Sequence, residues 1–290
     1  MSQGEFVLGD GRRVAWPAVH RLDFAVTAAF LGRASGAAGL LGERGIPGRP
    51  ALFLPGRTLV VVAYQEFGAS PVGPYRQVSV SLPLHVPAGG PARPLRAPLL
   101  LPLLVQSLGS TERVYRDLHF YVAEIPASEP SAVPYSVEVW GEPGWAADIV
   151  AGEPSQAGSP AAGGRRRWEV AVRAPAPPPA TGTAGKGSGP GLLLRLQASL
   201  LGGLALYERR GYRLISRRGD EVLTDVMRVE APGHLAFGPW RARLQLGDHP
   251  KAAALRTILG DRPTCIQTLV HRPSAARPGT VSFQGGTVYG

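Results

Sequence analysis

The chain has 290 residues, of which 44% are hydrophobic, and its mean hydropathy of +0.01 is compatible with a substantial buried core. Its net charge is +10, but only two of its 31 basic residues are lysines, and the arginines form small clusters without interleaved aromatic side chains. Nucleic-acid binding normally needs such stacking aromatics along a basic groove, so the composition argues against a nucleic-acid-binding protein.

The cysteine content and the apolar runs exclude further classes. Cys265 is the single cysteine, so the chain has no intramolecular disulfide and no CxxC metal or redox motif. The most apolar run, 98–105, is far shorter than the roughly 20 residues that a membrane-spanning helix needs. Residues 1–16 are polar and glycine-rich and lack the apolar segment of a signal peptide. We therefore expect a soluble cytoplasmic protein without membrane contact.

The 38 glycines and 29 prolines favour many turns and short strands over long helices. Residues 58–64 and 77–84 carry strand-like apolar runs on either side of a turn rich in glycine and proline, which predicts a hairpin. Residues 118–123 and 135–140 (YSVEVW) show a similar alternation, and they predict a second pair of adjacent strands.

Further elements follow in the second half of the chain. Residues 168–173 and 192–197 predict a third pair of strands, and residues 221–230 predict another strand. Residues 250–259 give the clearest helix signal, because alanines and leucines follow a proline in the first turn and Asp248 is a candidate N-cap.

Two tracts, Ala151–Gly164 and Ala174–Gly191, are rich in alanine, glycine, proline and serine. They can bury too little apolar surface to offset the entropy lost on ordering. We expect both to be flexible loops between strands.

Three separated segments carry a resemblance to a known family. They are Val-Gly-Pro-Tyr-Arg-Gln at 72–77, the turn Trp-Gly-Glu-Pro-Gly-Trp at 140–145, and a tail of Leu-Thr-Asp-Val, Gly-Pro, Leu-Gln-Leu and Asp-His within 223–249. In this order they resemble the G-P-Y-x-E element, the lysine-bearing active-site turn and the T-D-V to D-H tail of the acetoacetate decarboxylase superfamily.

The resemblance implies one α+β domain over residues 1–290. Its predominantly antiparallel β-structure would form a curled sheet or barrel around an apolar pocket, with few helices. The many short predicted strands and the lack of a βα alternation agree with this fold class. Members commonly form homo-oligomers, so we expect a homo-oligomer that binds a small-molecule ligand and uses no cofactor or metal.

The resemblance also implies a chemistry that this chain lacks. In the family, a lysine amine forms an imine with a β-keto acid, and the imine accepts the electrons released as carbon dioxide leaves. Gly144 occupies the lysine position here, and Trp145 follows it. Gln77 stands in place of a pocket glutamate, and Arg21 corresponds to a pocket arginine near the first strand.

The two lysines of the chain do not restore this amine. Lys186 lies in a Gly/Ser tract where nothing desolvates it, and Lys251 lies near the start of the predicted helix as a solvated surface charge. We therefore predict that imine-forming decarboxylation is absent.

The resemblance places several remaining side chains at the pocket. Arg76 is a candidate for binding a carboxylate, and Trp145 for filling the space that the lysine leaves. Glu142 and Tyr75 are the candidate catalytic residues, because a desolvated glutamate has a raised pKa that suits acid–base chemistry. The predicted ligand-binding set is Arg76, Gln77, Trp140, Gly144, Trp145 and Arg21.

A structural interpretation of the same residues stays open. Tyr75 and Trp140 can instead be core residues, and Arg76 and Glu142 can be solvated charges at strand ends.

Other catalytic motifs are absent from the sequence. It has no GxSxG, no HExxH and no phosphate-binding loop, and its six histidines lack metal-ligand spacing. His249 is expected to brace the helix start, and Cys265 to be a small buried side chain.

Two functions therefore compete. The first is a diverged protein of the acetoacetate decarboxylase-like fold that binds a keto-acid or acyl ligand without imine-forming decarboxylation. The alternative is a small-molecule lyase or hydratase that uses non-lysine acid–base chemistry in the same pocket.

Overall fold

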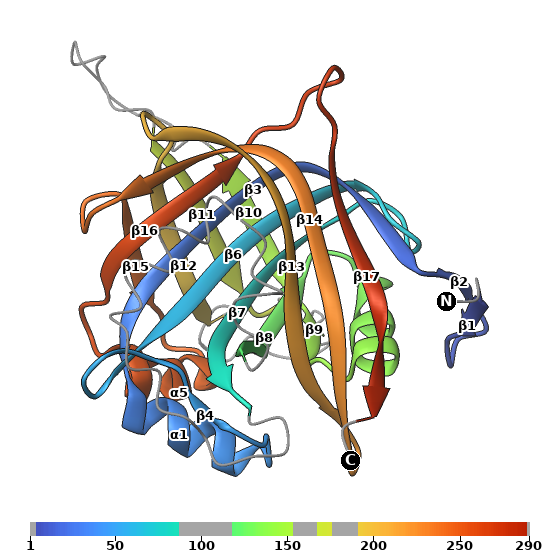
Figure 1. Cartoon of the computed structure of the whole chain (residues 1–290), viewed down its shortest axis with the longest axis horizontal. Helices are drawn as coiled ribbons and strands as arrows, with labels where there is room; N and C mark the ends of the chain where they lie inside the picture. Colours follow the sequence, from blue (N-terminus) through green and yellow to red (C-terminus); the bar gives the residue numbers. More distant parts are fainter. Residues whose placement is uncertain (1–3, 87–117, 153–166, 176–190, 289–290) are drawn as a thin grey trace, which may run out of the picture.

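The computed structural model describes residues 4–86, 118–152, 167–175 and 191–288, and strands dominate it (Figure 1). Its strands are β1 (Gly4–Val7), β2 (Arg13–Trp16), β3 (Ala18–Arg33), β4 (Arg49–Pro50), β5 (Leu52–Leu54), β6 (Arg57–Ala69), β7 (Tyr75–His85), β8 (Leu118–Ala127), β9 (Gly144–Ala146), β10 (Asp148–Gly152), β11 (Arg167–Arg173), β12 (Leu192–Ser199), β13 (Leu204–Arg218), β14 (Glu221–Phe237), β15 (Ala242–Leu246), β16 (Thr264–His271) and β17 (Gly279–Val288). The helical segments are α1 (Ala34–Glu43), α4 (Ala132–Pro134), the π-helical turn η1 (Tyr135–Val139) and α5 (Pro250–Leu259).

The largest sheet curves strongly, as Figure 1 shows. Strand β3 pairs with β6 along one edge and with β16 and β17 along the other. The pairings continue from β6 through β7, β8 and β13 to β14, which itself pairs with β16 and β17. All of these pairings are antiparallel except the parallel contact of β13 with β8. The sheet therefore returns to β3, and one of its faces is concave.

Residue alternation gives the two faces of this sheet different environments, as the pleat of a strand requires. Along β6, Val60, Val62 and Tyr64 are buried in a core that also contains side chains of α5 and of the four-stranded sheet β10–β11–β12–β15. The intervening Val61 and Ala63 line a pocket on the opposite face. The convex face thus supports the fold, and the concave face holds the candidate site.

Most of the predicted elements agree with the structure. The hairpin predicted from 58–64 and 77–84 is β6 with β7, and the strands predicted at 168–173 and 192–197 are the paired β11 and β12. The strand at 221–230 is part of β14. Predominantly antiparallel β-structure, the predicted fold class, is confirmed over the described residues.

The prediction of a strand at 135–140 is wrong, because this segment is helical. Its buried residues include Tyr135, Ser136, Val139 and Trp140, which recur with a helical period, whereas Val137 is 42% exposed. The apolar alternation in YSVEVW indicated a strand, but α4 begins just before it and leads directly into η1. Strand β8 pairs with β7, β9 and β13 instead.

The helix at 250–259 is confirmed as α5, but its predicted N-cap is wrong. His249 is the N-cap, and its Nδ1 accepts a hydrogen bond of 3.2 Å from the backbone N–H of Lys251. Asp248 accepts a bond from the Leu192 backbone instead, at 3.1 Å. The expectation that His249 braces the helix start is confirmed.

The two predicted loops lie mostly outside the described residues. Ala151 and Gly152 belong to β10, and 153–164 and 176–190 are not described. Within the described part of the chain, no helix is both long and apolar enough to cross a membrane.

Candidate functional site

The concave face of the large sheet lines a cavity of about 180 Å³. Its walls come from inward-facing residues of β3, β6, β7, β8, β13, β14, β16 and β17, with side chains of η1 and the turn after it. Most of the lining side chains are apolar, and the polar ones include two groups that each contain a glutamate. Such a lining, apolar with a few converging polar groups, is typical of small-molecule sites.

The first group is the histidine–tyrosine cluster, formed by His20, Tyr75, Tyr135 and Glu142. His20 Nε2 lies 3.1 Å from the Tyr135 hydroxyl, and His20 Nδ1 lies 3.3 Å from the Tyr75 hydroxyl. Burial lowers the pKa of His20 to about 4, so its ring is neutral at pH 7. One ring nitrogen of a neutral histidine donates and the other accepts, and the hydroxyls can serve both.

Glu142 is the acidic member of this cluster. It is buried, at 7% exposure, and it lines the pocket, so the interpretation as a solvated charge is wrong. Burial, followed by the negative charge of Asp225, raises the pKa of Glu142 to about 8. Gly141, with a φ of 63°, ends the helical segment and turns the chain so that Glu142 follows it into the pocket wall.

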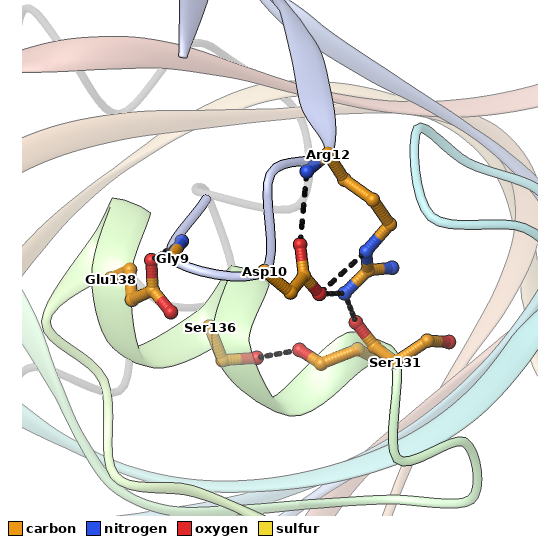
Figure 2. Close-up of polar contacts among 7 residues, drawn as sticks. Gly9, Asp10, Arg12, Ser131, Ser136 and Glu138 are labelled. Atoms are coloured by element: carbon orange, nitrogen blue, oxygen red, sulfur yellow. Dashed lines mark hydrogen bonds and ion pairs between the residues drawn. The ribbon is translucent and has the colours of Figure 1, made fainter. Parts of the chain in front are cut away.

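The N-terminal residues hold the helical segment that carries part of this cluster (Figure 2). The Gly9 backbone N–H donates to Glu138 Oε2 at 2.6 Å. Arg12 Nη2 donates to the Ser131 carbonyl at 2.8 Å, while its Nε binds Asp10 at 2.7 Å. These contacts fix both ends of the segment that presents Tyr135 to the pocket.

The second group is the arginine cluster, formed by Glu208, Arg210, Tyr212 and His271. The first three alternate along β13 and therefore share its inward face, and His271 ends β16. His271 Nε2 lies 2.6 Å from Glu208 Oε2, the Tyr212 hydroxyl donates to Glu208 Oε1, and Arg210 Nε lies 3.8 Å from Glu208 Oε1.

The charge of Glu208 is stabilised although its side chain is only 1% exposed. Burial acts to raise the pKa of Glu208, but the adjacent His271 and the charge of Arg210 outweigh burial and lower this pKa. The carboxylate is therefore ionised at neutral pH. Arg210 Nη2 and His271 Nδ1 are buried and have no hydrogen-bond partner in the described residues.

Four of the predicted site residues line the pocket: Tyr75, Gln77, Trp140 and Glu142. Tyr75 and Trp140 are also packed into an apolar core, as the structural interpretation proposed. The Gln77 side-chain amide donates to Gln65 Oε1 at 2.6 Å.

The other four do not line it. Arg21 pairs with Asp23 at 2.9 Å, and Arg76 contacts Glu66 at 3.4 Å with its side chain 44% exposed. Trp145 donates through Nε1 to Glu124 at 3.0 Å and stacks on the His249 ring.

Gly144 lies directly behind the pocket wall. A Cβ at this position would come within 2.8 Å of the Cβ of Ser136, which itself lines the pocket.

Neither lysine contributes to the described lining. Lys251, expected to be a solvated surface charge, is 34% exposed, and its Nζ lies 2.6 Å from Glu124 and 5.3 Å from the Trp145 ring centroid. Lys186 lies outside the described residues. Across the described part of the chain, no group of three or more His, Cys, Asp or Glu side chains is arranged to hold a metal.

No sequence motif had indicated the arginine cluster or His20. The alternation Glu-x-Arg-x-Tyr-x-Leu at 208–214 was the available signal, because it places three polar side chains on one face of a strand. His20 and His271 carried no local motif. Cys265 is buried as predicted, and burial raises its pKa to about 11.

No protein-family model matches the chain, and no curated protein is significantly similar to it. Solved structures do resemble it, each over 94% of this chain and at 10% sequence identity. They include an acetoacetate decarboxylase with a TM-score of 0.54 over 89% of its chain, and the acetoacetate decarboxylase of Legionella pneumophila with 0.54 over 87%. The enduracididine biosynthesis enzyme MppR, complexed with the condensation product of pyruvate and imidazole 4-carboxaldehyde, matches with a TM-score of 0.51 over 88% of its chain. The chain therefore has an acetoacetate decarboxylase-like fold.

Proposed function

We propose that the curled sheet encloses an apolar pocket that binds a small keto-acid or acyl ligand without imine-forming decarboxylation. The observation that carries this proposal is the described pocket lining, which combines apolar walls with two polar clusters but contains no lysine. An imine requires a neutral primary amine at the reacting carbon. Lys251 is held by Glu124 at 2.6 Å and does not line the pocket.

The structural neighbours support the class of ligand. One is an acetoacetate decarboxylase, and MppR is bound to a product derived from pyruvate. Both names point to small carbonyl compounds, and the polar side chains at the pocket of this chain suit such compounds. Gln65 and Gln77 can donate to a carbonyl oxygen, while the apolar walls contact a hydrocarbon chain.

Position 144 is the proposed site of the lost amine. Gly144 lies against Ser136, so a side chain there would reach the pocket only if Ser136 left room for it. The double variant Gly144→Lys/Ser136→Gly therefore offers a lysine a path into the pocket.

The test is the intact mass of the protein after incubation with acetoacetate or pyruvate and borohydride, which reduces an imine to a stable adduct. We expect no adduct on the unmodified chain and one adduct on Gly144→Lys/Ser136→Gly. An adduct on the unmodified chain would contradict the proposal. Lys251→Arg and Lys186→Arg would then identify the amine.

A second candidate function is acid–base catalysis by Glu142, as in a lyase or hydratase. The observation that favours it is the pKa of Glu142, raised to about 8 in a carboxyl group that lines the pocket. Tyr75, in the same cluster, is the candidate partner that binds the carbonyl oxygen. In such a step Glu142 takes a proton from the carbon next to the carbonyl, and the electron pair moves to the carbonyl oxygen.

This candidate predicts exchange of the C3 protons of 2-oxohexanoate in D₂O, followed by NMR, with a rate that rises as pH increases through about 8. Glu142→Gln should abolish the exchange above the uncatalysed rate. Binding without exchange in the unmodified chain would leave the protein a binder and reject the catalytic role.

A further inference from the structure

We propose that the arginine cluster binds the carboxylate of an organic acid, with Arg210 Nη2 and His271 Nδ1 as its hydrogen-bonding groups. The inference rests on the proposed small-molecule pocket. It adds which part of the pocket binds the carboxylate of the ligand and which part binds its hydrocarbon chain. It involves residues that lie outside the three segments behind the family resemblance.

The first support is that buried hydrogen-bonding capacity is left unused. The His271 side chain is 4% exposed and the Arg210 side chain 11%, yet Nδ1 of the one and Nη2 of the other have no partner in the described residues. An unsatisfied buried polar group costs about 1–3 kcal/mol, and folded proteins rarely leave one without a reason. Both residues line the pocket, where a ligand can supply the missing oxygen atoms.

The second support is that Glu208 leaves some hydrogen-bonding groups of the neighbouring side chains without a partner. Its Oε1 accepts from Tyr212, and its Oε2 lies beside His271. The nearest guanidinium atom, Arg210 Nε, stands 3.8 Å away, which is longer than a hydrogen bond. Glu208 therefore positions the cluster, and Arg210 Nη2 is left for another acceptor. Arginine matches a carboxylate well, because its planar fork presents parallel donors.

The charge of Arg210 fits an added anion. Its guanidinium stands 3.8 Å from Glu208, beyond hydrogen-bond distance, so a ligand carboxylate can approach Nη2 without displacing an existing hydrogen bond of that atom.

The surroundings also suit an acid that carries a hydrocarbon chain. Leu214, Met227, Val229, Leu235 and Leu269 line the same pocket. Gly233 keeps room for the histidine, because a Cβ there would lie 3.0 Å from His271 Cδ2. The ligand class is thus a small monocarboxylate, with an acyl or 2-oxoacyl chain in the apolar part of the cavity.

The test measures binding by calorimetry with two probes, 2-oxohexanoate and the uncharged 2-oxohexanamide. On the unmodified chain we expect the acid to bind at least about 10-fold more tightly than the amide, because a charge-assisted hydrogen bond is lost with the amide. This comparison needs no variant and so does not depend on how a substitution affects folding.

Two adjacent arginines provide matched variants. Arg210→Gln should weaken binding of the acid about 10- to 100-fold and leave binding of the amide nearly unchanged. Arg209→Gln is the control, because Arg209 lies on the outer face of β13, where it is 81% exposed and pairs with Glu230 at 3.3 Å. His271→Gln is a second test of the cluster, with circular dichroism as the check on folding of every variant.

The outcomes separate the two proposals. Equal binding of acid and amide, or of the acid to Arg210→Gln and Arg209→Gln, would overturn the carboxylate site while the pocket proposal stands. Failure of both probes to bind the unmodified chain would overturn the pocket proposal and the carboxylate site together.

Discussion

The two polar clusters face one pocket but differ in how far the protein satisfies them. In the histidine–tyrosine cluster, each ring nitrogen of His20 lies within hydrogen-bond distance of a tyrosine hydroxyl. In the arginine cluster, buried nitrogens of Arg210 and His271 have no such partner in the described residues. The fold thus supplies a partner for each ring nitrogen of His20, whereas the arginine cluster has donor and acceptor capacity left for a ligand.

The first cluster is also packed more tightly into the protein core than the arginine cluster is. Tyr135 of the first cluster and the adjacent Trp140 belong to an aromatic core that includes Trp16 and Phe283. The arginine cluster is held mainly by its contacts to Glu208. Substitutions near the first cluster should therefore affect stability more than a substitution of Arg210.

The largest effect is expected for Trp140→Ala. This side chain is 3% exposed, and its ring centroid lies 4.7 Å from that of Phe283 and 4.8 Å from that of Trp16. Its removal should lower the free energy of unfolding by about 3–5 kcal/mol in urea titrations. Trp240→Ala is the control, because Trp240 is 68% exposed and its removal should change the free energy of unfolding little. Equal losses in the two variants would contradict the assigned core.

Gly144→Ala is expected to have the next largest effect. Its new Cβ would come within 2.8 Å of Ser136 Cβ, and such overpacking typically costs about 1–3 kcal/mol. Adding Ser136→Gly should recover part of the loss. Gly39→Ala is the control, since a Cβ at this helical position meets nothing within 4 Å and should be neutral or stabilising. A neutral Gly144→Ala would mean that position 144 is not packed against the pocket wall.

Glu142 should make stability depend on pH. The pKa of Glu142 is about 8 in the folded state against the ordinary 4.5, so the folded chain keeps a proton that the unfolded chain has lost between these values. The free energy of unfolding should therefore fall as pH rises through this window, by roughly 1 kcal/mol per pH unit.

The effect of Glu142 on stability is best measured between pH 6.5 and 8, because His20 opposes it at lower pH. The depressed pKa of His20, about 4 against the ordinary 6.5, has the opposite effect, because it makes stability rise with pH between those values. Urea titrations of Glu142→Gln should lose the decline above pH 6.5. The same slope in Glu142→Gln and the unmodified chain would show that Glu142 is not the group responsible.

The smallest effect is expected for Arg210→Met. Glu208 keeps His271 at 2.6 Å and the Tyr212 hydroxyl, and the variant removes a buried nitrogen that has no partner in the described residues. His271 contributes more than Arg210 to lowering the pKa of Glu208, and Arg210 makes no hydrogen bond to this carboxylate, so the free energy of unfolding should change by only about 1 kcal/mol. A loss as large as that of Trp140→Ala would assign Arg210 to the structure instead of to a ligand.

The elements that sequence predicted well are those whose local pattern and tertiary environment agree. The strands at 58–64 and 77–84 are apolar and flank a turn that glycine and proline allow, and helix 250–259 has a proline in its first turn. The prediction of a strand at 135–140 failed because its short apolar alternation also fits one side of a helix. The helix became recognisable only with Ala132 and Tyr135 buried one turn apart.

The site was predictable only where residues lie in a motif. Tyr75, Gln77, Trp140 and Glu142 come from two segments that resemble a family, and all four line the pocket. The arginine cluster joins β13 to the end of β16, and this contact depends on both strands pairing with β14. Sequence spacing carries no information on such a pairing, so His271 could not be assigned beside Glu208.

The most direct test of ligand binding in the pocket is a crystal structure of the protein with 2-oxohexanoate. We expect the ligand inside the pocket, with its carboxylate within hydrogen-bond distance of Arg210 Nη2 and no covalent bond to a lysine. A ligand bound outside the pocket, or joined to Lys251 or Lys186 as an imine, would contradict this expectation.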